Sequence, residues 1–86
     1  MERAWYVYIA RVRTGRYYTG ISTDPKRRIL EHNKGIGAKF THDQGPATLV
    51  YVSLAFPNKS SARTREAQIK KWSRHKKDRL IDGEWV

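Results

Sequence analysis

Three segments of the chain carry apolar and aromatic side chains in the pattern of β-strands. Residues 4–12 alternate between the two faces of a strand and are rich in aromatic and β-branched residues. Residues 16–22 follow after a turn at residues 13–15, and residues 48–56 form the most apolar segment. We therefore predict three strands, the first two joined as a hairpin.

The segment between the second and third strands has the boundaries of a helix followed by a loop. Over residues 23–35, Asp24 suits the N-cap, Pro25 the first turn and Gly35 the C-terminal stop. Residues 36–47 contain glycine and proline among polar side chains, which is typical of a loop.

A second helix follows the third strand. Asn58 or Ser60 caps a predicted helix over residues 60–74, and residues 75–83 either continue it or form a short additional helix. The order strand, strand, helix, strand, helix predicts an α+β fold in a single domain of residues 1–86. We expect a small three-stranded antiparallel or mixed sheet flanked by helices.

The length of the first turn decides which tyrosines share a face of the hairpin. A two-residue turn would place Tyr8 and Tyr18 on opposite faces, because a one-residue shift in register reverses every side chain. A three-residue turn over residues 13–15 places Tyr18 opposite Ala10, on the face of Tyr8. Gly15 then occupies the last loop position, where a left-handed conformation is favoured. We predict the three-residue turn.

That register divides the hairpin into two sets of side chains. One face carries Tyr6, Tyr8, Ala10, Tyr18 and Gly20, and the other carries Trp5, Val7, Ile9, Tyr17, Thr19 and Ile21. Tyr8 and Tyr18 could be ordinary half-buried residues, but Gly20 weakens a strand and is typical of a close approach by a ligand or another backbone. We therefore interpret Tyr17 as a packing residue and expect room for a phosphate beside Gly20.

The composition adds a strong positive charge. The 86 residues include 18 Lys and Arg and 8 Asp and Glu, so the formal net charge is 18 − 8 = +10. A charge of this size on a small domain favours a polyanionic partner, nucleic acid before an acidic membrane surface. The absence of cysteine excludes disulfides and thiolate zinc sites, and the acids are too scattered for a two-metal site. No apolar run is long enough for a membrane span or a signal peptide, so we expect a cytoplasmic protein.

The two main predicted helices supply the remaining candidates. Arg28 and His32 lie four residues apart and so share one face of the first helix. Glu66 lies within the apolar stripe of the second helix. A buried carboxylate needs a partner, which is either a neighbouring cation such as Arg63 or Lys70, or a divalent metal ion in a cleft.

These residues together resemble the signature of the GIY-YIG nuclease family. The tripeptides "YVY" (6–8) and "YTG" (18–20) look like its two signature tripeptides, although Tyr6 stands where the family has glycine. On the following helix Arg28 matches the family's catalytic arginine, and on a later helix Glu66 matches its metal-binding glutamate. The chain looks most similar to the small stand-alone bacterial members, which are largely of unassigned function.

The resemblance implies a metal-dependent endonuclease that hydrolyses phosphodiester bonds in DNA, with RNA as the alternative substrate, and that acts in DNA repair or processing. One Mg²⁺ or Mn²⁺ ion would be held by Glu66, and Arg28 would bind the scissile phosphate. Tyr8 would be the base and Tyr18 a positioning partner, or the reverse, with His32 bonded to a tyrosine hydroxyl or relaying the proton. The cations expected to follow the nucleic-acid backbone are Lys39, Lys70, Lys71, Arg74, Lys76 and Lys77.

Two further classes of protein stay open from the sequence. Tyr6, and the absence of a further polar residue that many family members carry beyond the position of Glu66, favour a nucleic-acid-binding protein of the same fold with little or no catalysis. A protein–protein adaptor with a basic surface is the other class, and strong salt dependence of DNA binding would count against it. Neither a membrane nor a specific protein partner is implied.

Overall fold

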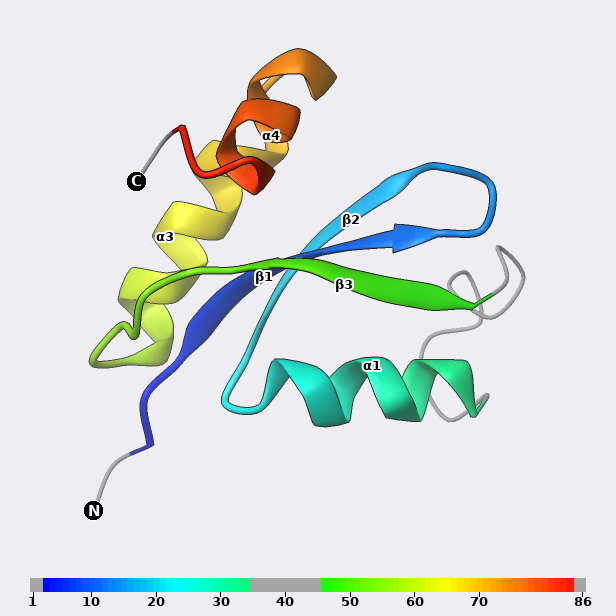
Figure 1. The fold of residues 1–86 in the computed structure, drawn as a ribbon. Coiled ribbons are helices and arrows are strands. Elements are labelled where there is room, and N and C mark those ends of the chain that lie inside the picture. Colours follow the sequence, from blue (N-terminus) through cyan, green and yellow to red (C-terminus); the bar gives the residue numbers. More distant parts are fainter. Residues whose placement is uncertain (1–2, 35–45, 85–86) are drawn as a thin grey trace.

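A computed structural model describes residues 3–34 and 46–84, and their elements follow the predicted order (Figure 1). They are β1 (Tyr6–Val12), β2 (Tyr17–Ser22), α1 (Pro25–Asn33), β3 (Ala47–Val52), α3 (Lys59–Lys70) and α4 (Arg74–Ile81). The strands form one sheet in the order β2-β1-β3, and both pairings are antiparallel. The α+β prediction is confirmed, and the open choice between an antiparallel and a mixed sheet is settled as antiparallel.

The β1–β2 hairpin has the predicted three-residue turn. The amide of Val12 donates to the carbonyl of Arg16 at 3.0 Å, which closes a loop of residues 13–15. Gly15 has a φ of 92°, the left-handed conformation that the last loop position requires. Ala10 consequently pairs with Tyr18, so Tyr8 and Tyr18 share a face of the sheet.

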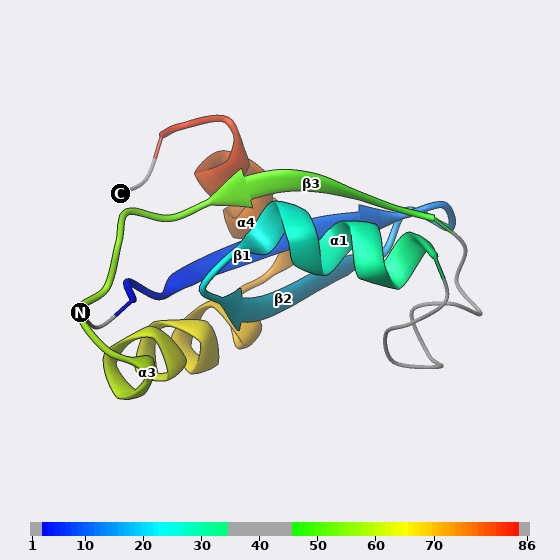
Figure 2. The ribbon, with the colours of Figure 1, turned by 90° about the horizontal axis from the view of Figure 1, so that it is seen from below.

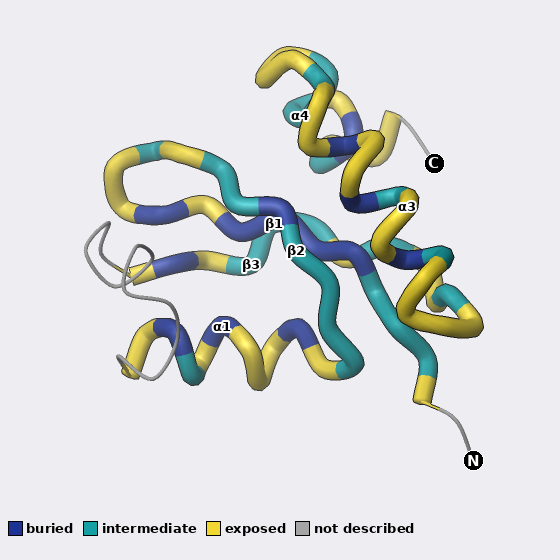
Figure 3. Tube along the Cα trace, turned by 180° about the vertical axis from the view of Figure 1, so that it is seen from behind, coloured by how far each residue is buried: buried dark blue, intermediate teal, exposed yellow. Residues whose placement is uncertain are grey.

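The sheet is covered by helices on both faces. Figure 1 and Figure 2 show α1 packed along one face and α3 with α4 on the other. The α1 face buries Tyr8, Ala10, Val12, Ile29 and Ala47, and the opposite face buries Val7, Ile9, Ala62, Ile69 and Leu80. The central strand β1 contributes to both cores, and Figure 3 shows its buried segment between the two helical layers.

Helix α1 begins and is anchored through local polar contacts. Asp24 is its N-cap and accepts a hydrogen bond from the amide of Arg27 at 3.2 Å, and Pro25 is in the first turn, as predicted. At the other end, the amide group of Asn33 bonds the backbone of Ala47 twice, at 2.7 and 3.0 Å. This double contact ties the end of α1 to the start of β3. The predicted stop at Gly35 and most of the predicted loop of residues 36–47 lie outside the described residues.

The C-terminal half differs from the sequence prediction at two places. The helix predicted over residues 60–74 ends at Lys70, and a separate helix α4 begins after Ser73. The cause is local, because the Ser73 hydroxyl accepts the amide of Lys76 at 3.2 Å and so caps a new helix. The alternative of a short additional helix is therefore correct. No helix in the described ranges is long and apolar enough to cross a membrane.

The third strand is also shorter than residues 48–56. β3 ends at Val52, because the side chain of Ser53 replaces a backbone partner and accepts the amide of Val7 at 2.9 Å. The backbone amide of Ser53 still donates to the carbonyl of Val7 at 2.8 Å, and the chain then pairs again at an isolated bridge between Phe56 and Trp5, just before β1. Residues 53–56 therefore continue from β3 as an irregular segment rather than as a regular strand.

Candidate active site

Tyr8 and Gly20 face each other across the β1–β2 pair. Only 7% of the Tyr8 surface is exposed, and a Cβ added to Gly20 would lie 2.7 Å from the Tyr8 hydroxyl oxygen. The close approach expected at Gly20 is real, but the neighbour is the Tyr8 phenol. The expectation of free space for a phosphate beside Gly20 is therefore wrong, because the phenol ring fills that space.

The Tyr8 hydroxyl lies under the influence of charges from both helical layers. Burial raises the pKa of Tyr8, the charge and hydrogen bonding of Arg28 lower it, and the charge of Glu66 raises it. Arg28 belongs to α1 and Glu66 to α3, so side chains from helices on opposite faces of the sheet act on one phenol. The net direction is upward from 10.0, so the phenol of Tyr8 holds its proton at neutral pH.

His32 is buried on α1, one turn beyond Arg28. Burial and the charge of Arg28 lower its pKa, and the opposing effect of Glu31 is smaller. Its imidazole is therefore neutral at pH 7. Within the described ranges no hydrogen-bond partner contacts its Nδ1 atom, which leaves a buried polar atom available to a bound group.

Tyr18 lies on the same face as Tyr8 and packs against the same core. Its ring is half-buried and its hydroxyl oxygen is buried. Tyr17, the preceding residue, points to the other face, where it packs against the core of Val7 and Ile9. The interpretation of Tyr17 as a packing residue is confirmed. Of the site residues assigned from sequence, Tyr8, Tyr18, Arg28 and His32 lie on the α1 side of the sheet, whereas Glu66 belongs to α3 on the opposite side.

The match to known proteins accords with this geometry. The family model described as the GIY-YIG catalytic domain matches residues 4–79, which spans every strand and nearly all of the helices. The chain belongs to the GIY-YIG family.

Relatives of this GIY-YIG protein are small proteins whose names assign no function. The UPF0213 protein SSP2268 of Staphylococcus saprophyticus is 46% identical over 76 residues, which covers 88% of this chain and 92% of the relative. The solution structure of the UPF0213 protein BH0048 from Bacillus halodurans has a TM-score of 0.57 at 44% identity, and covers 92% of this chain and 83% of that one. The solution structure of EF2693 from E. faecalis has a TM-score of 0.62 at 32% identity, with coverage of 95% and 86%.

Glu66 is the carboxylate that the GIY-YIG resemblance assigns to a metal ion. It is 8% exposed, and its oxygens lie 3.4 Å from Lys70 Nζ and 3.9 Å from an Arg63 nitrogen. The ion pairs of Glu66 with Arg63 and with Lys70, which the sequence suggested as alternatives to a metal ion, are therefore both present. Among the described residues no group of three His, Asp or Glu side chains gathers around a metal position. Mg²⁺ commonly binds proteins through one or two carboxylates and completes its shell with water and substrate phosphates, so this single carboxylate fits an ion that arrives with substrate.

The side chains predicted to contact nucleic acid lie in several different surroundings. Lys70 pairs with Glu66, Lys76 lies 4.2 Å from the centre of the Trp72 ring, and Lys71 is exposed at the end of α3. Arg74 and Lys77 line a pocket on the outer side of β2. Lys39 lies outside the described residues.

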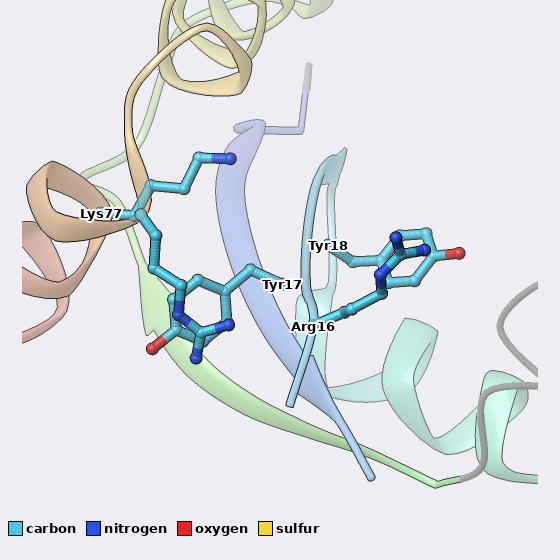
Figure 4. Close-up of a pocket in the computed structure, with 5 residues that line it drawn as sticks. Arg16, Tyr17, Tyr18 and Lys77 are labelled. Carbon is cyan, nitrogen blue, oxygen red and sulfur yellow. The ribbon is translucent and has the colours of Figure 1, made fainter. Parts of the chain in front are cut away.

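A second group of cations beside this pocket was not predicted from the sequence. Arg16 lines it together with Arg74 and Lys77, and Figure 4 shows Tyr17 and Tyr18 extending to opposite sides of β2 at its edge. Arg11 and Arg13 line the neighbouring pocket, which also contains Arg74. The signal was present in the run "RVRTGR" (11–16), where three arginines surround the turn.

Proposed function

We propose that this GIY-YIG protein is a metal-dependent endonuclease that hydrolyses phosphodiester bonds in DNA. The observation that supports it best is that Arg28 from α1 and Glu66 from α3 both act electrostatically on one buried phenol, that of Tyr8. A purely structural tyrosine has no need of a cation and a carboxylate from two separate helices. Clustered groups that shift one another's pKa are typical of functional sites. A role in DNA repair or processing stays a prediction.

Arg28 would bind the scissile phosphate in this proposal. Its guanidinium can form charge-assisted, bidentate hydrogen bonds with phosphate oxygens, and it would favour the transition state because negative charge increases there. Its present partner is weak, since Glu31 lies 3.9 Å away and the Arg28 side chain is 44% exposed. A phosphate can therefore displace that contact at little cost.

The tyrosines would handle the attacking water. The Tyr8 phenol holds its own proton at neutral pH, so it would take the proton of that water only as it passes its own to a base, for which His32 is the candidate. Tyr18 would orient the water from the same face, and the reverse assignment of the two tyrosines is the alternative. His32 has a neutral ring and a free Nδ1 within the described residues, so it can accept the proton of a tyrosine hydroxyl. An Mg²⁺ or Mn²⁺ ion held by Glu66 would supply positive charge at the phosphate and cancel the carboxylate charge that raises the pKa of Tyr8.

A nucleic-acid-binding protein with little or no catalysis is the second candidate. One observation favours it, because Lys70 and Arg63 already neutralise the Glu66 carboxylate. In such a protein Glu66 would hold α3 in place and would bind no metal ion. The two candidates differ in whether loss of Glu66 removes an activity or only stability.

A cleavage assay with two variants and a matched control separates these candidates. We would incubate purified protein with branched, flapped and single-stranded DNA in Mg²⁺ or Mn²⁺ and measure nicking. We expect wild type to nick DNA and Arg28→Ala and Glu66→Ala each to abolish nicking, while Glu84→Ala, which removes an exposed carboxylate paired with Arg79, keeps it. Equal residual cleavage in all of these proteins would reveal a contaminant and overturn the nuclease proposal. DNA binding without metal-dependent cleavage would instead support the second candidate.

A further inference from the structure

Two pockets meet at Arg74 beside the β1–β2 hairpin. One has a volume of about 290 Å³ and contains Arg16, Tyr18 and Lys77 in its wall, and the other, of about 440 Å³, contains Arg11 and Arg13. Arg74 lines both, so the two pockets are neighbours, and we call them together the hairpin groove. Its five cationic residues are Arg11, Arg13, Arg16, Arg74 and Lys77.

The cations of the hairpin groove differ from other cations of the protein in their pairing with carboxylates. Among the described residues, none of the five forms an ion pair. Other cations of the helices do so, namely Arg27, Arg28, Arg63, Lys70 and Arg79. One acid lies close to the groove, but Asp78 accepts a hydrogen bond of 2.5 Å from the Tyr17 hydroxyl. The groove therefore concentrates positive charge that the carboxylates of residues 3–34 and 46–84 leave largely uncompensated.

Arg74 is held in position for an external ligand. Its guanidinium lies 4.0 Å from the centre of the Tyr17 ring, and one of its nitrogens donates to the carbonyl of Gly15 at 2.6 Å. A guanidinium has five N–H donors in a rigid plane, so several donors remain for a phosphate after these contacts form. Tyr17 is fixed in turn by Asp78, so the ring supports Arg74.

The same contacts argue against base recognition in the groove. Arg74 covers one face of the Tyr17 ring, the ring packs against the core, and the Tyr17 hydroxyl already donates to Asp78. Tyr17 therefore offers a nucleic-acid base neither a stacking surface nor a hydrogen-bonding group. The hydroxyl oxygen of Tyr18 is buried, so the polar side chains that the groove offers are mainly its five cations, with Thr48 beside them. Cations that contact phosphates position a nucleic acid but carry no sequence information.

We propose that the hairpin groove binds the sugar–phosphate backbone of the nucleic-acid strand on one side of the scissile bond, independently of sequence. Tyr18 connects the hairpin groove to the candidate active site, because it lines the groove and also lies on the same face of the sheet as Tyr8. Figure 4 shows Tyr18 on one side of β2 and Lys77 reaching from α4 on the other, so the groove wraps the free edge of the sheet. The identity of the strand as a substrate rests on the proposed function, whereas its binding does not.

Binding is measured apart from cleavage. Fluorescence anisotropy of a labelled single-stranded oligonucleotide in EDTA gives the affinity at several salt concentrations. Each phosphate contact contributes about 0.7 to the slope of log K against log salt on single strands, so Arg16→Ala and Arg74→Ala should each lower the slope by about 0.7. Arg79→Ala removes the same charge from α4 but breaks a pair with Glu84, and it should leave the slope unchanged. Circular dichroism melting confirms that each variant is folded.

Two further arms make the result decisive. Arg74→Lys keeps the charge and should keep the slope while losing several-fold in affinity, since an ammonium lacks the planar fork that Tyr17 supports. The losses should be equal for a homopolymer and a mixed sequence. Wild-type slope and affinity in the two alanine variants, a loss confined to one base sequence, or binding to vesicles containing phosphatidylserine without binding to oligonucleotides would each overturn the proposal. If wild type binds as expected but never cleaves, the groove stands and the nuclease proposal fails.

Discussion

Tyr17 and Tyr18 are adjacent in sequence and lie in opposite environments. The Tyr17 hydroxyl donates a hydrogen bond to Asp78, and the guanidinium of Arg74 packs over the Tyr17 ring. Both contacts join β2 to α4. Tyr18 faces the other way and packs with Tyr8 on the α1 side. Alternation along a strand places identical side chains on different faces, so residue type is a weaker guide to role than register is.

The two faces of the sheet differ in the same way as the two tyrosines. The face under α3 and α4 is filled by large aliphatic side chains such as Ile9, Ile69 and Leu80, all almost fully buried. The face under α1 contains a phenol and, on the helix, a neutral imidazole. The face under α3 and α4 therefore supplies much of the stability, whereas the face under α1 carries the tyrosine and histidine side chains of the proposed site, to which α3 adds the buried carboxylate of Glu66.

Removing the hydroxyl of Tyr8 or of Tyr17 should give the largest difference in nicking between the two faces of the sheet. Tyr8→Phe should lower nicking by about 10²–10⁴-fold, the range typical of a lost acid–base group, with little change in DNA binding. Tyr17→Phe should keep nicking and lose about 1 kcal/mol of stability, because it breaks the hydrogen bond with Asp78. Nicking rates and thermal melts of both variants provide the measurement. Equal loss of nicking in the two would mean that the faces are not functionally distinct.

Truncating the aliphatic core should act on stability alone. Ile69 is fully buried, so Ile69→Ala should cost about 2–5 kcal/mol in the free energy of unfolding. Leu30 on α1 is 58% exposed, and Leu30→Ala serves as the matched control, with a change within about 0.5 kcal/mol. Urea titration of both variants checks the difference. A small effect at Ile69 would show that the α3 face is not the main source of stability.

The contact between Gly20 and Tyr8 tests the fit within the site. Gly20→Ala places a methyl group 2.7 Å from the phenol oxygen, so the buried ring must shift. We expect a loss of about 1–3 kcal/mol in stability and a larger fractional loss of nicking. Tyr8→Leu in the same background should restore most of the stability, and a double-mutant cycle measures the coupling. Additive effects of the two substitutions would exclude the contact.

The smallest expected effect is a pH dependence at His32. Because the pKa of His32 is lower in the folded protein than its ordinary value of 6.5, the unfolded chain binds more protons in this range. Stability should therefore be undiminished above pH 6.5 and should fall as the pH drops below that value. Comparing urea midpoints of wild type and His32→Asn between pH 7.5 and pH 5 isolates the effect. An identical pH profile for the two proteins would show that His32 does not titrate with folding.

Local signals explain why so much of the fold followed from the sequence. Gly15 set the turn length, and the turn length set which tyrosines share a face. Asp24 and Pro25 marked the start of α1 with two independent preferences. Each of these signals depends only on neighbours in sequence, so no tertiary information was required.

Of the three features that the sequence did not reveal, the Ser73 cap is local, and the other two depend on contacts between separate segments. The Ser73 cap divides a run of good helix formers, and residue preferences alone do not favour one cap over a continuous helix there. The close contact between Gly20 and the Tyr8 ring depends on how that ring is oriented on the neighbouring strand. The hairpin groove required α4 to fold back beside the β1–β2 turn, where Arg74 bonds Gly15 across 59 residues of sequence.

The most direct test of the active-site assignment compares Arg28→Ala with Arg27→Ala. The two arginines are adjacent, both contact Glu31, and each substitution removes one positive charge from α1, but only Arg28 acts on Tyr8. Nicking of DNA in Mn²⁺ is measured for both variants at equal protein concentration. We predict that Arg28→Ala abolishes nicking and that Arg27→Ala, whose side chain is 73% exposed, retains it. Equal activity of the two variants would contradict the assignment of the Tyr8, Arg28 and Glu66 cluster as the active site.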